Sequence, residues 1–308
     1  AIELDPKLVA AYTNLGNALK EQGKLDEAIA LYRKNIEIDP NYASAHYRLG
    51  VALNEQGKRD EAIACFRKAI DVDPKHVLAH SNLGTMARER RRPGEALAHF
   101  ESSAAIEQRL LIANPEDADL RYSLAESYSW AGTCLLDLGR LDDSERSFRR
   151  ALDLLEALHR KGANPRHSEE YADVGALLAG VLANRGEAAR AVAQFEQSNS
   201  VYAALARHDP SNASWQRSRL RGERLLGELR QQDLALAERL HALALWESGR
   251  IEAALVVGRR ANERIAAVAG ESGRETLRLN AALIADRYGR LLDATGNPAR
   301  AAEVWSEA

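Results

Sequence analysis

Apolar residues recur along the chain at spacings of three and four, through long stretches rich in Ala, Leu, Glu and Arg. This spacing places the apolar side chains on one face of an α-helix, and no segment shows the strict alternation that is typical of a β-strand. We expect each of the eight prolines to lie near a helix end or a turn, because proline cannot continue the helical hydrogen bonds. These are Pro6, Pro40, Pro74, Pro93, Pro115, Pro165, Pro210 and Pro298. The pattern predicts an all-α chain of stacked amphipathic helices.

The pattern also repeats itself at an interval of 34 residues, since YTNLGNALKEQGKLDEA (12–28) is followed by HYRLGVALNEQGKRDEA (46–62). Three successive units share a glycine, an alanine and an aromatic residue at equivalent places: Gly16, Gly50 and Gly84; Ala28, Ala62 and Ala96; Tyr32, Phe66 and Phe100. We expect the small residues to let two paired helices approach closely. The neighbouring leucines should fill the space beside them: Leu15, Leu49 and Leu83.

This combination resembles the tetratricopeptide repeat, a helix-turn-helix unit of about 34 residues. Over residues 7–106 the glycine, aromatic and Asp-Pro positions fit the family, although His46 and His80 replace the aromatic that Tyr12 supplies in the first unit. The resemblance implies a right-handed α-solenoid, because one repeat cannot bury its apolar face alone and neighbouring repeats must stack. It also implies a concave groove lined by the first helix of each repeat.

Later units are longer. Pro115 and Pro210 both come seven residues after the place that the regular repeat predicts. Seven residues are two helical turns, so the lengthened helix should keep the same face inward. We therefore expect three regular units and the end of a preceding one over 1–113, two extended units over 114–210, and degenerate helical repeats over 211–308. The later part resembles the long repeat arrays of bacterial signalling proteins such as STAND ATPases and serine/threonine kinases.

Composition narrows the function. The formal charge of −3 gives no electrostatic reason to expect a nucleic-acid partner, and no apolar run is long enough to span a membrane. Cys65 and Cys134 fall at apolar positions, which is typical of small core residues in a reducing compartment. We therefore expect a cytoplasmic protein without a disulfide framework, and the resemblance to the repeat arrays of bacterial signalling proteins implies a bacterial one. The start AIELDP (1–6) has no Met and matches the helix end NIEIDP (35–40), so we expect that the chain was cut from a longer one.

Motifs for catalysis are absent from the sequence. It contains no phosphate-binding loop, no nucleophile elbow and no C-x-x-C pair. His76 and His80 have the i, i+4 spacing of a metal chelate but lack the H-E-x-x-H pattern, and His80 occupies the aromatic position of its repeat. We predict no enzyme activity, no cofactor and no metal. The run RERRRPGE (88–95) predicts either an anion site or a solvated turn, in which Arg91 replaces the usual glycine.

The predicted function is a scaffold that holds a peptide or partner protein in the groove. Asn14 and Asn82 share one position, where an amide can pair with a peptide backbone, but Arg48 interrupts this ladder. Family members that bind the carboxyl termini of chaperones use a clamp of Lys, Asn and Arg residues. Too few of these positions match in this chain for us to expect that function. The predicted binding residues, all on first helices, are Asn14, Asn17, Lys20, Ser44, Tyr47, Arg48, Asn54, Ser81, Asn82 and Arg88.

Two alternatives stay open at this stage. In one, the chain is the regulatory or substrate-recruiting arm of a kinase, STAND ATPase or glycosyltransferase whose catalytic domain lies elsewhere. In the other, the solenoid associates with copies of itself and the groove is empty.

Overall fold

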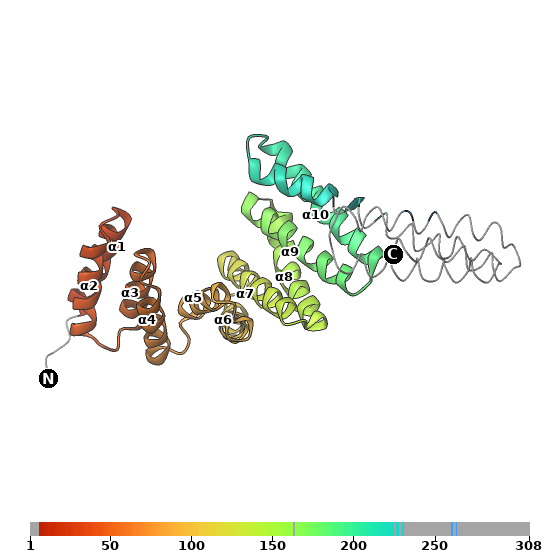
Figure 1. Cartoon of the computed structure of the whole chain (residues 1–308). Helices are drawn as coiled ribbons and strands as arrows, with labels where there is room; N and C mark the ends of the chain where they lie inside the picture. The colour runs from red at the N-terminus through yellow and green to blue at the C-terminus, as the bar shows by residue number, and fades with distance from the viewer. Residues whose placement is uncertain are drawn as a thin grey trace, which may run out of the picture. The chain divides into compact units, whose positions relative to one another are not determined.

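A computed structural model describes residues 6–162, 164–224, 226–227, 230, 260 and 263. The described residues form α-helices joined by short turns and contain no β-strand, which confirms the all-α fold class (Figure 1). The helices are α1 Pro6–Glu21, α2 Leu25–Ile38, α3 Ala43–Glu55, α4 Arg59–Val72, α5 Val77–Glu89, α6 Pro93–Ala113, α7 Ala118–Asp137, α8 Leu141–Lys161, α9 Pro165–Asn184 and α10 Ala188–His208. Residues 213–224 are also helical. Most of the degenerate helical repeats predicted over 211–308 lie outside the described residues.

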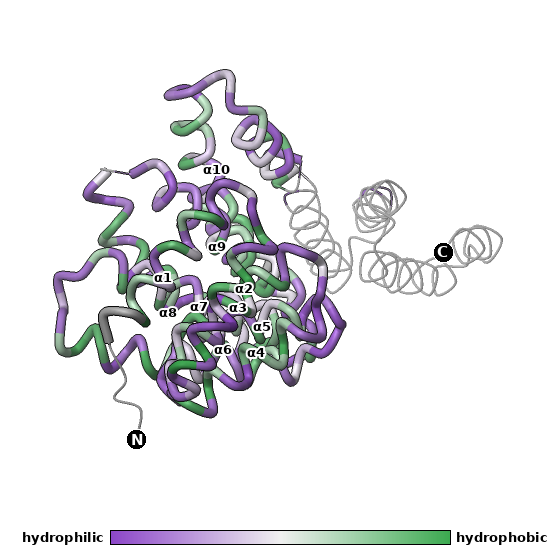
Figure 2. The backbone as a smooth tube through the Cα atoms, turned by 90° about the vertical axis from the view of Figure 1, so that its left-hand side faces the viewer, coloured by the Kyte–Doolittle hydropathy of each residue, from purple (hydrophilic) through white to green (hydrophobic). Residues whose placement is uncertain are grey.

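The chain divides into two compact units, residues 1–163 and 164–308. In the first unit each helix from α1 to α8 contacts the next one along the chain, so its hairpins stack in sequential order as a repeat solenoid requires. In the second unit α9 contacts α10. Figure 2 colours the backbone tube by hydropathy and shows hydrophobic and hydrophilic stretches following one another at short intervals along the described chain. The division by repeat type at 113 and 210 stays a prediction.

Each hairpin of the first unit is held by a glycine against an aromatic ring. A Cβ atom added to Gly16 would lie 2.6 Å from the Tyr32 ring, and one added to Gly50 would lie 2.7 Å from the Phe66 ring. Both distances are shorter than a carbon–carbon contact allows, so only glycine fits. The third and fourth hairpins repeat this contact in the pairs Gly84–Phe100 and Gly132–Phe148, each with 2.8 Å between the added Cβ and the ring. The expected role of the small residues is confirmed.

The expectation for the leucines beside these glycines holds in two of three repeats. Leu49 and Leu83 are buried in one apolar cluster that joins α2 to α5. Leu15 is 52% exposed, so its predicted burial is wrong. The physical reason is its place in α1: none of the described residues forms a hairpin on the outer side of that helix.

The extended repeats have the predicted two additional turns. The second helices α2 and α4 have 14 residues, whereas α6, α8 and α10 have 21. The first helices lengthen with them, from 13 residues in α3 and α5 to 20 in α7 and α9. In α8 the buried face continues along the whole helix through Phe148, Ala151, Leu155 and Leu158. A step of seven residues keeps the apolar stripe on the same side, because it is close to two full turns.

Left-handed residues end the first helices. Gly57 has a φ of 79° and Gly139 a φ of 72°, a region that costs an L-residue about 1–2 kcal/mol. Arg91 occupies the equivalent turn between α5 and α6 and takes a φ of 57°. The turn therefore keeps the same backbone shape and is strained at Arg91. Second helices end differently, with Asp39-Pro40 after α2 and Asp73-Pro74 after α4, as the sequence predicts.

Candidate functional site

The equivalent outer positions of α1, α3, α5 and α7 form a surface that we call the first-helix face. Its first row contains Asn14, Arg48, Asn82 and Trp130; the second row contains Asn17, Val51, Thr85 and Thr133; the third row contains Lys20, Asn54, Arg88 and Leu136. The 34-residue period and the glycine of each hairpin fix this correspondence. The face begins with amides and charges at α1 and becomes apolar and aromatic at α7.

Polar contacts join α1 to α3 on this face. The Arg48 guanidinium donates from Nη1 to Oδ1 of Asn17 over 2.8 Å. The Tyr32 hydroxyl donates to the same oxygen, also over 2.8 Å. Beside them Lys20 Nζ lies 2.9 Å from a carboxylate oxygen of Glu55. Three predicted binding residues thus have partners within the protein, and their side chains hold a fixed polar surface.

The two asparagines of the predicted ladder differ in their surroundings. Asn14 is exposed and makes no hydrogen bond to any described residue. Asn82 is half-buried, and its Nδ2 donates over 2.8 Å to the carbonyl oxygen of Leu78 in the same helix. Its amide is therefore oriented by its own helix, and Oδ1 is the end that faces away from that carbonyl. Asn54 is exposed and Ser44 half-buried, and neither has a hydrogen-bond partner in the described part of the chain.

Tyr47 links α3 to the next repeat. Its ring centroid lies 4.8 Å from that of His76 and 5.7 Å from that of Phe66. Burial raises the pKa of the Tyr47 hydroxyl, and a hydrogen bond from the Asn82 side chain acts in the opposite direction. The hydroxyl is therefore neutral at physiological pH and reaches the neighbouring first helix. Ser81 on α5 has a different partner, the hydroxyl of Ser103 at 2.9 Å.

Arg88 and Trp130 join α5 to α7. The Arg88 guanidinium lies over the Trp130 ring with 4.3 Å between Cζ and the ring centroid, which is cation–π geometry. Trp130 stacks on Phe100 with 6.2 Å between centroids, yet 41% of the tryptophan remains exposed. The sequence analysis did not identify Trp130, because it compared the position of Asn14 and Asn82 only across the first three repeats. The signal was present: Gly132, Gly139 and Phe148 place Trp130 at the position of Asn14 and Asn82.

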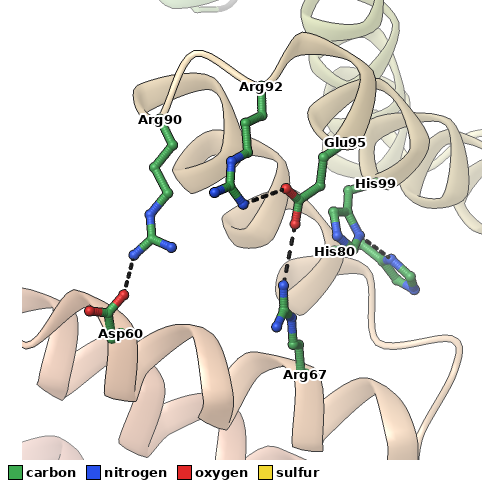
Figure 3. A network of polar contacts seen from close by, with 7 residues as sticks. All are labelled: Asp60, Arg67, His80, Arg90, Arg92, Glu95 and His99. Carbon is green, nitrogen blue, oxygen red and sulfur yellow. Dashed lines mark hydrogen bonds and ion pairs between the residues drawn. The ribbon is translucent and has the colours of Figure 1, made fainter.

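Arg90 and Arg92 of RERRRPGE belong to a joint between the second and third hairpins, drawn in Figure 3. Arg90 reaches Asp60 on α4 with 2.5 Å between Nη2 and Oδ1. Glu95 lies between Arg92, at 3.4 Å, and Arg67 of α4, at 3.3 Å. Equivalent contacts join the first and second hairpins, where Gln56 donates to Asp26 over 2.7 Å. Arg90 and Arg92 thus pair with carboxylates of the protein, which favours the solvated-turn interpretation of these two residues over an anion site.

The histidines and cysteines of the described residues were the candidates for metal binding or catalysis. Within the described residues no three His, Cys, Asp or Glu side chains gather as a metal site. His80 and His99 face each other with 3.4 Å between their Nδ1 atoms, and burial lowers the pKa of His99. Burial also raises the pKa of the Cys134 thiol to about 11, so this cysteine is a protonated core residue rather than a nucleophile. None of the described helices is long and apolar enough to cross a bilayer.

Models of one protein family match parts of this chain. Models for the tetratricopeptide repeat match residues 1–30, 43–76 and 125–154, and a model described as a TPR repeat matches residues 16–57. The matches cover the first two hairpins and the central part of the α7–α8 hairpin. No curated protein sequence matches the chain.

Several solved structures have a similar arrangement of helices. YrrB, described as a TPR protein with an unusual peptide-binding site, is 22% identical with a TM-score of 0.47, covering 69% of this chain and 90% of its own. MamA is 18% identical with a TM-score of 0.48, covering 67% of this chain and 97% of its own. PilF from Pseudomonas aeruginosa is 21% identical with a TM-score of 0.45, covering 71% and 92%. At these values the likenesses carry no information on a ligand.

Proposed function

We propose that this chain, a tetratricopeptide-repeat protein over residues 1–76 and 125–154, is a non-catalytic interaction module that binds a segment of a partner protein on its first-helix face. The observation that carries the proposal is the continuity of this face. Side-chain contacts cross every joint between its four helices: Asn17 with Arg48, Tyr47 with Asn82, and Arg88 with Trp130. A face built in this way can hold an extended segment along several repeats.

The chemistry of the face suggests how such a segment is held. The Nε atoms of Arg48 and Arg88 are buried and have no acceptor among the described residues, while Nη1 of Arg48 is held by Asn17 and the Arg88 guanidinium lies over the Trp130 ring. A guanidinium that is fixed in this way binds a carboxylate or a peptide carbonyl at little entropic cost. The exposed Trp130 ring offers an apolar contact one repeat further along. We infer a ligand with acidic or backbone oxygens near Arg48 and Arg88 and an apolar side chain near Trp130.

Affinity capture from an extract of the source organism, quantified by mass spectrometry, tests the proposal. The Arg88→Ala, Trp130→Ala double variant should recover about tenfold less of each specific partner than the intact chain, because both anchors of the face are removed. The matched control is Arg33→Ala with Leu220→Ala, which removes an exposed arginine of the second helix α2 and an exposed leucine from outside the first unit. Circular dichroism checks that both variants keep their helices. Equal recovery with both variants would overturn the assignment of this face.

The recruiting arm of a larger signalling enzyme and self-association both stay predictions. The first-helix face is compatible with either, since each requires a surface that recognises protein. Light scattering over a range of concentrations separates self-association from binding of a different partner: a constant monomer mass would count against it.

A further inference from the structure

A second surface lies on the other side of the extended repeats, where α6 and α8 flank α7. Two adjoining hollows occur there, with volumes of about 690 Å³ and 410 Å³. Gln108, Tyr128 and Arg150 line both of them, so the hollows form one continuous groove. We call it the α6–α8 groove. It is lined mainly by the second helices α6 and α8, and none of the residues of the first-helix face lines it.

One half of the groove is apolar. Leu111 and Ile112 of α6, Leu124 of α7 and Leu154 of α8 line the larger hollow. Ile112 is 77% exposed. A large aliphatic side chain with that exposure has a favourable free energy to gain from being covered, at about 25 cal/mol per Å² of apolar surface. Leu111 and Leu154 beside it are half-buried and Leu124 is buried, so Ile112 stands out on an otherwise partly covered apolar lining, as is typical of a surface that a partner covers.

The groove as a whole has a small excess of positive charge, because its lining contains four arginines and three carboxylates: Arg121, Arg140, Arg146 and Arg150 with Glu101, Asp143 and Asp153. Arg140 and Arg146 line the smaller hollow, and both pair with the carboxylate of Asp143. Arg150 differs from them. Its guanidinium lies over the Tyr128 ring at 5.6 Å, and no carboxylate pairs with it in the part of the chain that the structure describes. The groove therefore presents two arginines without a carboxylate partner among the described residues, Arg150 and Arg121, of which Arg121 donates to the carbonyl oxygen of Pro115.

The added turns of the extended repeats build the apolar half. Leu111 and Ile112 lie in the last turn of α6, beyond the length of α2 and α4. Leu124 lies near the start of α7, whose seven additional residues match those of α6. A second helix of regular length would end before Leu111, and a first helix of regular length would begin after Leu124. The additional residues thus produce a surface that the regular repeats have no residues to form.

We propose that the α6–α8 groove binds an acidic amphipathic helix of a partner protein, with its apolar face on Ile112 and Leu154 and a carboxylate on Arg150. An apolar groove between two helices is the surface that an amphipathic helix covers. The guanidinium of Arg150 selects the residues beside the apolar face of that helix, because a guanidinium without a carboxylate partner attracts a carboxylate and repels a lysine. This site is separate from the first-helix face, so the two could bind different segments at the same time.

Selection from a displayed library of random peptides of about 16 residues, with the whole chain as bait, tests this proposal. Peptides that also bind the Ile112→Gln variant are removed by counter-selection. The remaining peptides should be rich in Leu, Ile, Phe and Glu or Asp at helical spacing. Fluorescence anisotropy should show at least about tenfold weaker binding of these peptides to Arg150→Gln and to Ile112→Gln than to the intact chain.

Two matched variants control for charge and exposed apolar surface. Arg160→Gln removes another exposed arginine of α8, and Leu220→Gln removes another exposed leucine. Both should bind the selected peptides as the intact chain does. The proposal is overturned if no peptide depends on Ile112, if the enriched peptides are basic, or if Arg150→Gln binds as tightly as Arg160→Gln. It is also overturned if sedimentation shows a dimer that Ile112→Gln dissociates, since the occupant is then a second copy. Loss of binding in the Arg88→Ala, Trp130→Ala variant alone would point to the first-helix face instead.

Discussion

The α3–α4 hairpin and the α7–α8 hairpin are built on the same joint although their lengths differ by half. In the first, Gly50 meets the Phe66 ring; in the second, Gly132 meets the Phe148 ring at nearly the same distance. Yet α3 and α4 have 13 and 14 residues, whereas α7 and α8 have 20 and 21. The comparison teaches that one close contact fixes how two helices pair. Length is then free to change, provided that it changes in steps that keep the apolar face inward.

The additional helical turns of the extended repeats contain residues of a different kind from the apolar core of the regular repeats. In the regular repeats the second helix ends soon after its aromatic residue, at Asp-Pro. In α6 the added part contains Glu107, which is only 1% exposed and accepts hydrogen bonds from Ser123 and from Ser127, the latter over 2.6 Å. It also contains the exposed Ile112. The extension thus adds a buried polar joint and an apolar surface, and these are the parts that distinguish the two kinds of repeat.

The largest expected effect comes from filling the shared joint. Gly50→Ala and Gly132→Ala should each lower the free energy of unfolding by about 1–3 kcal/mol, because the new methyl group would overlap an aromatic ring that has no space to move into. Urea unfolding followed by circular dichroism measures the change. The control is Gly180→Ala in α9, where an added Cβ meets nothing within 4 Å, so it should be neutral or stabilising. If only one of the two alanine variants is destabilised, the regular and extended hairpins do not share one joint.

The regular repeats were predictable from the sequence because each structural requirement leaves a distinct residue there. A close helix approach requires glycine, its counterpart is an aromatic such as Phe66, and a sharp stop requires Asp-Pro. The two added turns were predictable from the late Pro115 for the same reason. Burial of Leu15 was wrong, because burial depends on a neighbouring hairpin rather than on the residue itself.

The candidate site was less accessible to sequence reasoning. Periodicity indicated which helix faces outward, and it placed Arg48 and Asn82 on one surface. It could not indicate that Arg48 holds Asn17, or that Asn82 turns toward Leu78, because these pairings depend on side-chain rotamers and on the distance between repeats. The α6–α8 groove was missed entirely. It arises from three helices together, and no single segment carries a motif for it.

A smaller effect is expected at the turns, where the third repeat departs from the others. Arg91→Gly should raise the free energy of unfolding by about 1 kcal/mol, because glycine adopts the left-handed conformation without a Cβ clash. The converse change, Gly57→Ala, should lower it by about 1–2 kcal/mol. Thermal and urea unfolding both report these shifts. Arg92→Ala is the control for the lost charge, since Arg92 has a φ of −114° and no such strain to relieve. A stability gain of the same size in Arg92→Ala would show that charge, rather than backbone conformation, limits this turn.

The smallest effect depends on pH and tests the buried joint of the extended repeat. Burial raises the pKa of Glu107 above its usual value, although hydrogen bonds from Ser123 and Ser127 oppose the shift. The folded state therefore favours the protonated acid. The contribution of Glu107 to stability is complete below the unfolded-state pKa and declines as the pH rises through the raised folded-state pKa.

Glu107→Gln cannot ionise, so it should match the intact chain in acid and become more stable than it near neutral pH, by about 1 kcal/mol. Urea unfolding at a series of pH values gives this difference, with Glu101→Gln on an exposed position of α6 as the control for removing one carboxylate. A destabilised Glu107→Gln at neutral pH would mean that the two serine hydrogen bonds outweigh the cost of burying the charge. In that case the extension would be held together by an ionised carboxylate, and acid rather than base would loosen it.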